Sequence, residues 1–310
     1  MIEIKKILCP IDFSEISRHA YSYAAAIARW YQSEIVALHV VVNRPAVEAA
    51  PVPYVAVPPA LALEQVRTDA MRALPEFLRA AHGGDVKFKV LVVEAPDVHR
   101  EIVAQAGVIR PDLVVMGSHG RTGFDRIVLG SVAEKVLRKS AVPVLIVPPH
   151  AAGTPPPAAA RFHRILCATD FSTGSLEALT FAMSVAQEAD ADLILLHVIE
   201  ALPELYELSI GEHVNITALR AAVEAQSRER LQTLVPETVR TYCTVETAIS
   251  EGRASAEILR LAHDRQIDLI VMGVHGRGPI DRLIFGSNTH DVIRGATCPV
   301  LTVRGRTARG

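Results

Sequence analysis

The sequence predicts two consecutive open α/β domains, each with a parallel sheet that helices cover on both faces. Short runs of Val, Ile and Leu alternate with helical patterns along the chain. These runs are continuous and do not alternate with polar residues, which is typical of buried parallel strands. The same succession of segments then occurs a second time within the 310 residues. A chain of this length can form two cores of ordinary size.

An internal repeat organises the chain. The stretch ILCPIDFS at residues 7–14 recurs as ILCATDFS at 165–172, with six of eight positions identical and an offset of 158 residues. Residues 112–131 match residues 268–287 at twelve of twenty positions, with an offset of 156. Because the offset changes by only two residues over a whole copy, we predict two domains, 1–148 and 163–306. The Pro- and Ala-rich segment 149–162 is the expected linker, with a semi-extended course.

Local sequence patterns predict each strand and helix of the first copy. Residues 4–11 form an apolar strand, and Ser14 is a suitable N-cap for a helix to about Ser33. This helix has apolar residues spaced along one face, namely Ala20, Tyr23, Ala24, Ile27 and Trp30. The further expected strands are 35–42, 86–93, 113–116 and 144–147, and the further helices are 63–81, 97–109 and 131–139. In such a fold, ligands bind at the carboxyl ends of the strands.

Two segments, 43–62 and 200–215, follow the second strand of each copy without a clear pattern. Each is interpreted either as a lid or partner-binding loop, or as a surface insertion.

Composition narrows the function classes. Half of the residues are apolar, 21% are charged, and the formal charge is -2, so there is no electrostatic reason to expect nucleic acid or an acidic membrane surface. No secretory signal pattern and no membrane-length apolar run are evident, and we expect a cytoplasmic protein. The four cysteines lack metal-ligand spacing and are interpreted as buried apolar residues: Cys9, Cys167, Cys243 and Cys298.

Two related loops carry the main functional signal, GSHGRTGFDRIVLGS at 117–131 and GVHGRGPIDRLIFGS at 273–287. Gly117 and Gly120 allow the backbone to turn sharply and to approach a ligand closely. Gly130 and Ser131 open the next helix, whose free N–H groups favour a phosphate. One such loop is common for purely structural reasons, but the same intervals recur in the second copy at Gly273, Gly276 and Gly286.

An aspartate ends the first strand of each copy. The carboxylate of Asp12 or Asp170 stands beside the expected loop and can bind a ribose hydroxyl, an adenine amino group or a metal, or it only caps the following helix. The sequence has no G-x-x-x-x-G-K-[ST] pattern and no G-x-G-x-x-G after the first strand, which excludes a P-loop and a dinucleotide fingerprint.

No catalytic residue is assigned. The loop arginines approach a phosphate or stay solvated, and the loop histidines are proton carriers or plain turn residues; they are Arg121, Arg126, Arg277, Arg282, His119 and His275. No carboxylate pair, Ser-His-Asp set or metal cluster accompanies the loops in the sequence, and no metal ligand is assigned. The pattern therefore favours binding over turnover.

The strand-end Asp, the spacing G-2x-G-9x-G-[ST] and the final P-V-L-I-V strand resemble the universal stress protein (UspA) family, of the ATP-binding kind and in its tandem two-domain form. The resemblance covers nearly the whole chain apart from the linker and the two irregular segments. It implies Rossmann-like domains of the adenine nucleotide alpha hydrolase type, each with a five-stranded parallel sheet of order 3-2-1-4-5. It also implies ATP at the strand ends, with Mg²⁺ left open.

The resemblance also implies roles for individual residues. Asp12 would be an adenosine-side contact and Val40 a backbone contact to adenine. Gly117 and Gly120 would line the ribose and phosphates, and the phosphate tail would lie against Gly130, Ser131 and Val132. The matching residues of the second copy are Asp170, Val198, Gly273, Gly276, Gly286, Ser287 and Asn288.

The family pairs its domains through the last strand, here Pro143–Val147 and Pro299–Val303. We therefore expect an internal pseudo-dimer, with a homodimer of chains as a further alternative.

The expected function is that of an ATP-binding, nucleotide-dependent stress-response regulator with slow or no hydrolysis and an unidentified protein partner. Two alternatives remain open. One is an enzyme that hydrolyses ATP or transfers a nucleotidyl group. The other is an interaction module that binds another adenine nucleotide, such as AMP or cyclic AMP, or none.

Overall fold

The structure is a computed structural model, and it describes residues 2–43, 59–81, 86–120, 129–149, 162–200, 216–274 and 286–305. Apart from the first two residues, the chain divides into two compact units, Glu3–Ala160 and Arg161–Gly310. The expected linker lies almost wholly outside the described residues, so its semi-extended course stays a prediction. Phe162, at its end, is buried, and packing of the second unit therefore begins there.

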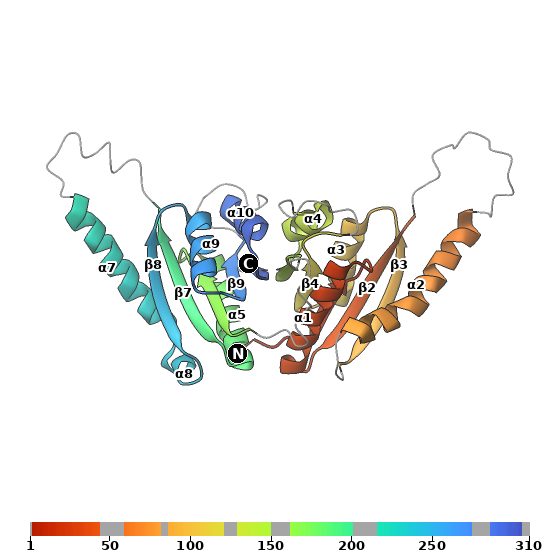
Figure 1. Cartoon of the computed structure of the whole chain (residues 1–310), viewed down its shortest axis with the longest axis horizontal. Coiled ribbons are helices and arrows are strands. Elements are labelled where there is room, and N and C mark those ends of the chain that lie inside the picture. Colours follow the sequence, from red (N-terminus) through yellow and green to blue (C-terminus); the bar gives the residue numbers. More distant parts are fainter. Residues whose placement is uncertain are drawn as a thin grey trace, which may run out of the picture. The chain divides into compact units, whose positions relative to one another are not determined.

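The first unit alternates strands and helices as the sequence predicts (Figure 1). Its elements are β1 (Lys6–Pro10), α1 (Glu15–Tyr31), β2 (Glu34–Val42), α2 (Pro59–Ala81), β3 (Phe88–Ala95), α3 (Val98–Ile109), β4 (Leu113–Gly117), α4 (Ser131–Lys139) and β5 (Val144–Val147).

The second unit repeats this succession and adds one short helix, α8. Its elements are β6 (Arg164–Ala168), α5 (Thr173–Ala189), β7 (Asp192–Ile199), α7 (Ile216–Leu234), α8 (Glu237–Arg240), β8 (Val245–Glu251), α9 (Ala254–Asp264), β9 (Leu269–Gly273), α10 (Ser287–Gly295) and β10 (Val300–Val303).

All the strands within each unit run parallel. The order in the first unit is β3-β2-β1-β4-β5, and the order in the second is β8-β7-β6-β9-β10. Numbered within each copy, both orders are 3-2-1-4-5, which confirms the predicted fold class. In this order the first strand is central, and its carboxyl end lies beside those of the second and fourth strands.

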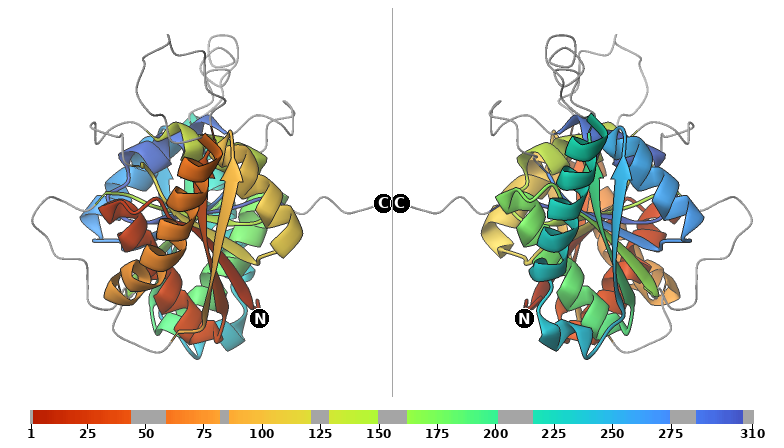
Figure 2. Two further views of the ribbon diagram at one scale, coloured as in Figure 1. Left: turned by 90° about the vertical axis from the view of Figure 1, so that its right-hand side faces the viewer. Right: turned by 90° about the vertical axis from the view of Figure 1, so that its left-hand side faces the viewer.

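Helices cover both faces of each sheet. In the first unit α1 packs against α2, and α3 packs against α4; in the second unit α9 packs against α10. Figure 2 shows the two outlying helices, α2 beside β3 in the left view and α7 beside β8 in the right view. The central strands are accordingly buried, with Ile7, Leu8 and Cys9 of β1 wholly inaccessible.

Polar residues fix the ends of these elements. Ser14 caps α1 by accepting a hydrogen bond from the Ser17 amide, and Ser172 caps α5 in the same way. At the amino-terminal ends of the strands, the Asp112 carboxylate accepts hydrogen bonds from the Lys5 and Lys6 amides at 2.7 and 2.9 Å. These interactions fix the register between the start of β1 and the turn before β4.

The structure differs from the sequence expectations in a few places. Helix α2 begins at Pro59, four residues before the predicted start, so the irregular segment of the first copy is shorter. Trp30 is only partly buried, because the buried stretch of α1 ends at Ala28. Residues 44–58 and 201–215, which hold most of the two irregular segments, lie outside the described residues.

Candidate functional site

The strand-end aspartates are held by the turn that follows them. Asp12 Oδ1 accepts hydrogen bonds from the Ser14 amide at 3.0 Å and the Ser14 hydroxyl at 2.5 Å. Between them, Phe13 adopts a left-handed conformation with φ of 64°, which is uncommon for a bulky residue and turns the chain sharply into α1. The carboxylate therefore stands at the carboxyl end of the central strand in a fixed position.

The second copy repeats this turn closely. Asp170 Oδ1 accepts from the Ser172 amide at 3.0 Å and the Ser172 hydroxyl at 2.6 Å, and Phe171 has φ of 63°. Burial raises the pKa of Asp170, but hydrogen bonds from Ser172 and Ser175 outweigh this and hold the pKa below its ordinary value. Asp170 is thus an anion at neutral pH.

A histidine on the second strand supports each of these turns. His39 Nδ1 lies 2.7 Å from the carbonyl oxygen of Ile11, and His197 Nδ1 lies 2.8 Å from that of Thr169. Since a carbonyl oxygen only accepts, Nδ1 carries the proton in both rings. The Phe13 ring meets His39 edge-on at 4.8 Å between centroids. The histidine thus holds the strand end directly before the aspartate.

The glycines of the first loop lie where a side chain would collide. A Cβ atom at Gly117 would come within 2.5 Å of Ile16 Cγ2, and one at Gly120 within 2.8 Å of Asp12 Oδ2. At Gly130, a Cβ atom would meet the Ser118 carbonyl oxygen at 2.9 Å. The backbone at these positions therefore packs closely against Ile16, Asp12 and Ser118, and its approach to a ligand stays a prediction.

Helix α4 begins without a side-chain cap. Gly130 is its N-cap residue, and the Gly130 amide donates a hydrogen bond to the Ser118 carbonyl oxygen at 2.8 Å. No side chain among the described residues caps the first turn, where Ser131 is exposed and Val132 half-buried. Such a turn presents free N–H groups and the positive end of the helix dipole to an anion.

The glycines of the second loop are also closely packed, although their neighbours are partly different. A Cβ atom at Gly273 would lie 2.9 Å from the backbone of Gly174 and Ser175, and one at Gly286 would lie 3.0 Å from the Val274 carbonyl oxygen. Gly286 also begins α10 without a side-chain cap. We call the strand-end aspartate, the loop glycines and the first turn of the following helix the cradle of each copy. Gly276 lies outside the described residues, so its place in the second cradle stays a prediction.

The expected adenine contacts lie at the end of the second strand. Val40 is buried and pairs with Val93 in the parallel register, whereas Val198 is half-buried and pairs with Ser250. Both follow directly after the histidine that holds the aspartate turn. The structure thus brings the described candidate residues of each copy to the carboxyl edge of that copy's sheet.

His119 lies between the glycines and is partly withdrawn from water. Its Nδ1 atom is 2.9 Å from the Ser118 hydroxyl oxygen, and its Nε2 atom is buried without a hydrogen-bond partner among the described residues. Burial lowers the pKa of His119, so the ring is neutral at pH 7. The other loop histidine and the four loop arginines lie outside the described residues: His275, Arg121, Arg126, Arg277 and Arg282.

Sequence reasoning did not assign a role to the histidine that supports the aspartate turn. The signal was present, because Leu-His-Val occurs at residues 38–40 and again at 196–198. It also did not identify Glu200, whose carboxylate oxygen Oε1 lies 3.4 Å from the Asn288 side-chain nitrogen. This contact joins two segments that are 88 residues apart and depends on the folded positions of β7 and α10.

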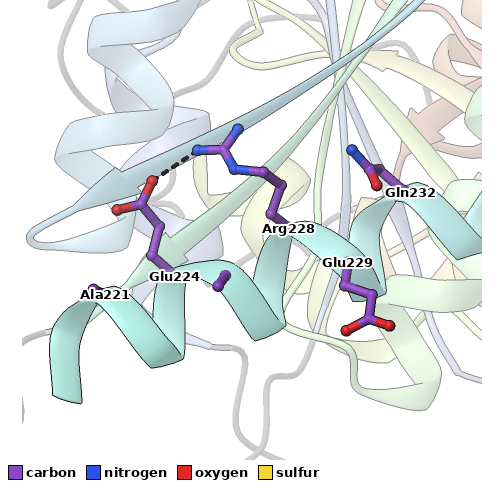
Figure 3. Close-up of a pocket in the computed structure, with 6 residues that line it drawn as sticks. Ala221, Glu224, Arg228, Glu229 and Gln232 are labelled. Carbon is purple, nitrogen blue, oxygen red and sulfur yellow. Dashed lines mark hydrogen bonds and ion pairs between the residues drawn. The ribbon is translucent and has the colours of Figure 1, made fainter. Parts of the chain in front are cut away.

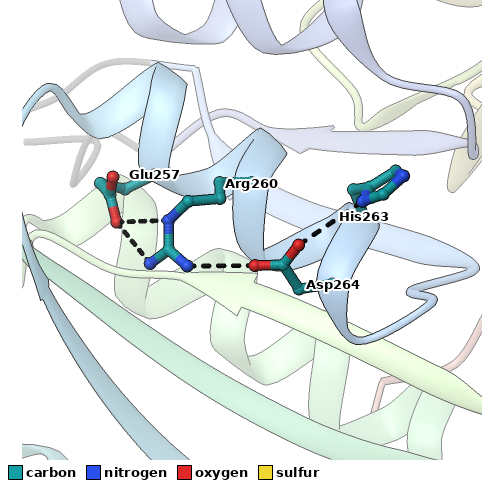
Figure 4. Close-up of polar contacts among 4 residues, drawn as sticks. All are labelled: Glu257, Arg260, His263 and Asp264. Carbon is teal, nitrogen blue, oxygen red and sulfur yellow. Dashed lines mark hydrogen bonds and ion pairs between the residues drawn. The ribbon is translucent and has the colours of Figure 1, made fainter.

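The remaining polar features lie outside the cradles. All four cysteines are free and buried, as predicted, and burial raises the pKa of Cys167 to about 12. On α9, Arg260 bridges Glu257 and Asp264, and His263 lies beside Asp264 (Figure 4). These charges satisfy one another on the helix surface and contribute little to stability.

One shallow hollow lies along α7, and its lining includes no candidate residue (Figure 3). It is lined by Ala221, Glu224, Ala225, Arg228, Glu229 and Gln232, with an ion pair of 2.7 Å between Glu224 and Arg228. Within the described ranges, no set of three or more His, Cys, Asp or Glu side chains is arranged to hold a metal ion. Nor does any helix there have the length and apolarity that a membrane crossing requires.

Comparison with known proteins agrees with both the fold and the repeat. The universal stress protein family matches the chain twice, over residues 3–148 and 161–304. A universal stress protein of Mycolicibacterium smegmatis is 27% identical over 307 residues, which cover 97% of each chain. One of Methanocaldococcus jannaschii is 35% identical over 147 residues, which cover 46% of this chain and 81% of that protein.

A solved structure shows the same fold over the full length. The crystal structure of a universal stress protein from Archaeoglobus fulgidus aligns with a TM-score of 0.63 and 23% identity, and the match covers 99% of this chain and 98% of that one. Together with the double family match, this shows that the chain belongs to the universal stress protein family and carries two family domains in tandem.

Proposed function

We propose that this protein binds ATP at the carboxyl edge of each sheet and acts as a nucleotide-dependent stress-response regulator, with slow or no hydrolysis. The observation that supports this most directly is the duplicated cradle. In each copy, a helix that lacks a side-chain cap begins beside close-packed glycines, and a fixed carboxylate stands at the end of the central strand.

The proposed contacts divide the nucleotide into two ends. The Asp12 carboxylate accepts hydrogen bonds from the adenosine end, and the Val40 backbone borders the adenine. The glycine backbone at 117 and 120 lines the ribose and phosphates. The amides of the first turn of α4, with Gly130, Ser131 and Val132, bind the phosphate tail. In the second copy we assign the same roles to Asp170, Val198, Gly273, Gly276, Gly286, Ser287 and Asn288.

The described part of the cradle is better suited to binding a nucleotide than to hydrolysing it. Asp12 and Asp170 accept hydrogen bonds from the serine that caps the next helix, and the His119 ring is held by the Ser118 hydroxyl at Nδ1 with its Nε2 atom buried. A general base must lie within hydrogen-bond reach of the proton that it removes, and a phosphoryl transfer enzyme must also stabilise the developing charge. We therefore propose that ATP favours one conformation, or one partner surface, over another.

Mg²⁺ would accompany the phosphates, since it usually binds through substrate phosphates and a few carboxylates. We also propose that the domains pair through Pro143–Val147 and Pro299–Val303.

Displacement of a fluorescent ATP analogue from the full chain tests the binding proposal. ATP, ADP, AMP, cyclic AMP and GTP are compared as competitors, and the recovered nucleotide is analysed after several hours. We expect ATP to compete better than GTP and to be recovered mostly intact. Rapid turnover would favour the enzyme alternative, and failure of every adenine nucleotide to compete would favour the interaction module.

A further inference from the structure

The phenylalanine that follows the strand-end aspartate of the second copy has a strained backbone conformation. Phe171 lies between Asp170 and Ser172, and the Ser172 amide and hydroxyl donate hydrogen bonds to the Asp170 carboxylate. The φ of 63° at Phe171 is uncommon for a bulky residue and persists only where the surroundings fix it. A change in the Phe171 backbone would therefore move the Asp170 carboxylate.

Contacts with residues from three parts of the second unit help to fix Phe171. Its amide donates to the Thr169 hydroxyl oxygen at 3.1 Å, and its buried ring lies 4.5 Å from the His197 ring, between centroids. From α7, the guanidinium carbon of Arg230 lies over the Phe171 ring, 4.1 Å from its centroid. A cation in this place is attracted by the negative face of the ring.

Helix α7 is attached to its sheet by few buried side chains. It lies beside β8 (Figure 2), and of its side chains that the structure describes only Ser227 and Leu231 are buried. The other described side chains of α7 are half-buried or exposed. The contact of Arg230 with Phe171 is therefore a substantial part of the attachment of this helix.

The first copy makes the same connection with residues of another kind. Phe77 of α2 meets the Phe13 ring edge-on, at 5.3 Å between centroids, and the Arg18 guanidinium carbon lies 4.5 Å from the centroid of the Phe77 ring. Phe13 has φ of 64° and also contacts His39. In both copies, the helix that precedes the third strand thus packs onto the residue after the strand-end aspartate.

One ring therefore joins α7 to the Asp170 carboxylate. The strain of a bulky residue in the left-handed region and the attraction between a guanidinium and an aromatic face are of the same order of magnitude. Loss of the Arg230 contact can for this reason shift Phe171 toward ordinary backbone conformations, and Asp170 with it.

We propose that Arg230 is a positioning residue for the second nucleotide site, and that docking of α7 on Phe171 is coupled to nucleotide binding at Asp170. This inference rests on the proposed adenine-nucleotide function and adds a regulatory route to it. Coupling is reciprocal, so a nucleotide held by Asp170 stabilises the docked position of α7, and its release weakens the docking. The state of the site is thereby transmitted to the exposed face of α7.

The first test measures ATP binding at the second copy of the full chain. Gly130→Val disables the first copy, since its side chain would meet the Ser118 carbonyl oxygen. On this background Arg230→Leu removes the cation and keeps an apolar side chain, and we expect ATP affinity to fall about fivefold. Arg230→Lys keeps the charge without the planar guanidinium and should restore part of this loss.

Removal of the aspartate separates positioning from a general loss of stability. Asp170→Ala itself weakens ATP binding, and the titration then uses a correspondingly higher range of ATP concentration. Because Asp170→Ala leaves no carboxylate to position, adding Arg230→Leu should lower ATP affinity further by less than about twofold. A merely structural role of Arg230 would weaken binding equally with and without Asp170.

A matched control lies two residues before Arg230 on the same helix. Arg228 pairs with Glu224 along the surface of α7 at 2.7 Å (Figure 3). Arg228→Leu removes one cation from α7, as Arg230→Leu does, and changes the net charge of the chain by the same amount. It should leave ATP affinity unchanged.

Hydrogen exchange measures the coupling from the nucleotide to the helix. In the Gly130→Val chain, ATP should slow amide exchange in peptides from residues 216–234 by about fivefold, and Arg230→Leu should remove most of this protection. Peptides from residues 59–81, in the corresponding helix of the disabled copy, are the reference. Their exchange should be the same with and without ATP.

Photolabelling of a chain with both copies intact keeps the test independent of Gly130→Val. The chain is labelled with 8-azido-ATP, and labelled peptides are assigned to residues 1–149 or 162–305 by mass spectrometry. We expect the share of label in the second range to fall in Arg230→Leu and to stay unchanged in Arg228→Leu.

The outcomes separate the two proposals. If no adenine nucleotide binds the second copy of the unmutated chain, the proposed function fails there and the inference fails with it. If ATP binds and Arg230→Leu behaves as Arg228→Leu does, only the inference is wrong. It is also wrong if the effect of Arg230→Leu persists in Asp170→Ala, or if ATP leaves the exchange of α7 unchanged.

Discussion

Gly120 lies so close to Asp12 that a Cβ atom at position 120 would come within 2.8 Å of the carboxylate oxygen Oδ2. The loop after β4 and the turn after β1 therefore border the same small space. They come from strands that are neighbours in the sheet but about a hundred residues apart in the chain. In the first copy, this approach gives a physical reason for the strand-end aspartate and the glycine spacing to occur together.

The first prediction concerns this approach. Gly120→Ala should displace either the Asp12 carboxylate or the loop backbone, and should weaken ATP binding at the first copy by about tenfold or about 1.4 kcal/mol. Titration of the Gly286→Val background, in which only the first copy binds, measures the change. Unaltered affinity would mean that Asp12 and Gly120 do not border the nucleotide.

The matched control for this prediction is Gly107→Ala. Gly107 lies on the exposed surface of α3, and a Cβ atom there would meet no atom within 4 Å. Alanine in a helix should raise the free energy of unfolding by about 0.5–1 kcal/mol. ATP affinity should stay as in the unmutated chain.

The second prediction concerns the histidines His39 and His197, each of which holds the carbonyl oxygen of the residue before the aspartate. His197→Leu removes the donor to the Thr169 carbonyl oxygen, which then lies buried without that partner. We expect the free energy of unfolding to fall by about 1–3 kcal/mol, and nucleotide binding at the second copy to weaken with it. His197→Asn keeps a side-chain N–H donor and should restore part of both losses. Urea unfolding and nucleotide titration of the two variants check this; equal loss in both would contradict it.

The third prediction is a pH dependence. Burial lowers the folded-state pKa of His119 below its ordinary value of about 6.5. Between the two pKa values the unfolded chain binds more protons than the folded chain, so stability is lost as pH falls below about 6.5. His99 behaves likewise, because burial lowers its pKa although the neighbouring Asp97 raises it.

Thermal unfolding between pH 8 and pH 5 measures this effect. His119→Gln should reduce the loss of stability at acid pH without abolishing it, because His99 still titrates. An unchanged pH profile in the variant would show that His119 is not withdrawn from water in the folded chain.

Much of the fold could be predicted from the sequence because its signals are local and occur twice. Continuous Val, Ile and Leu runs indicate buried parallel strands, and Ser14 and Asp97 mark helix starts that the structure places within one residue. The start of α2 was predicted four residues late, because Pro59 and the Ala-rich residues after it do not show a clear helical period. Proline is nevertheless compatible with the first position of a helix.

The candidate site could be predicted only where the backbone geometry requires one particular residue type. The glycines at 117, 120 and 130 were identifiable because close approach requires them, and the structure places all three against backbone or side-chain atoms. The contact of Glu200 with Asn288 was not identifiable, and the repeated Leu-His-Val at 38–40 and 196–198 marks a histidine without showing that it holds the strand end before Asp170. Both depend on which strand ends become neighbours, which no local pattern encodes.

The central claim is that each copy holds one adenine nucleotide, and calorimetric titration of the nucleotide-free chain with ATP and Mg²⁺ tests it most directly. The account predicts two sites per chain, one of which is lost in Gly286→Ala and the other in Gly130→Ala. A Cβ atom at either position would meet a backbone carbonyl oxygen, at 3.0 and 2.9 Å. Absence of binding heat with ATP, ADP and AMP alike would contradict the claim, and the cradles would then be structural loops.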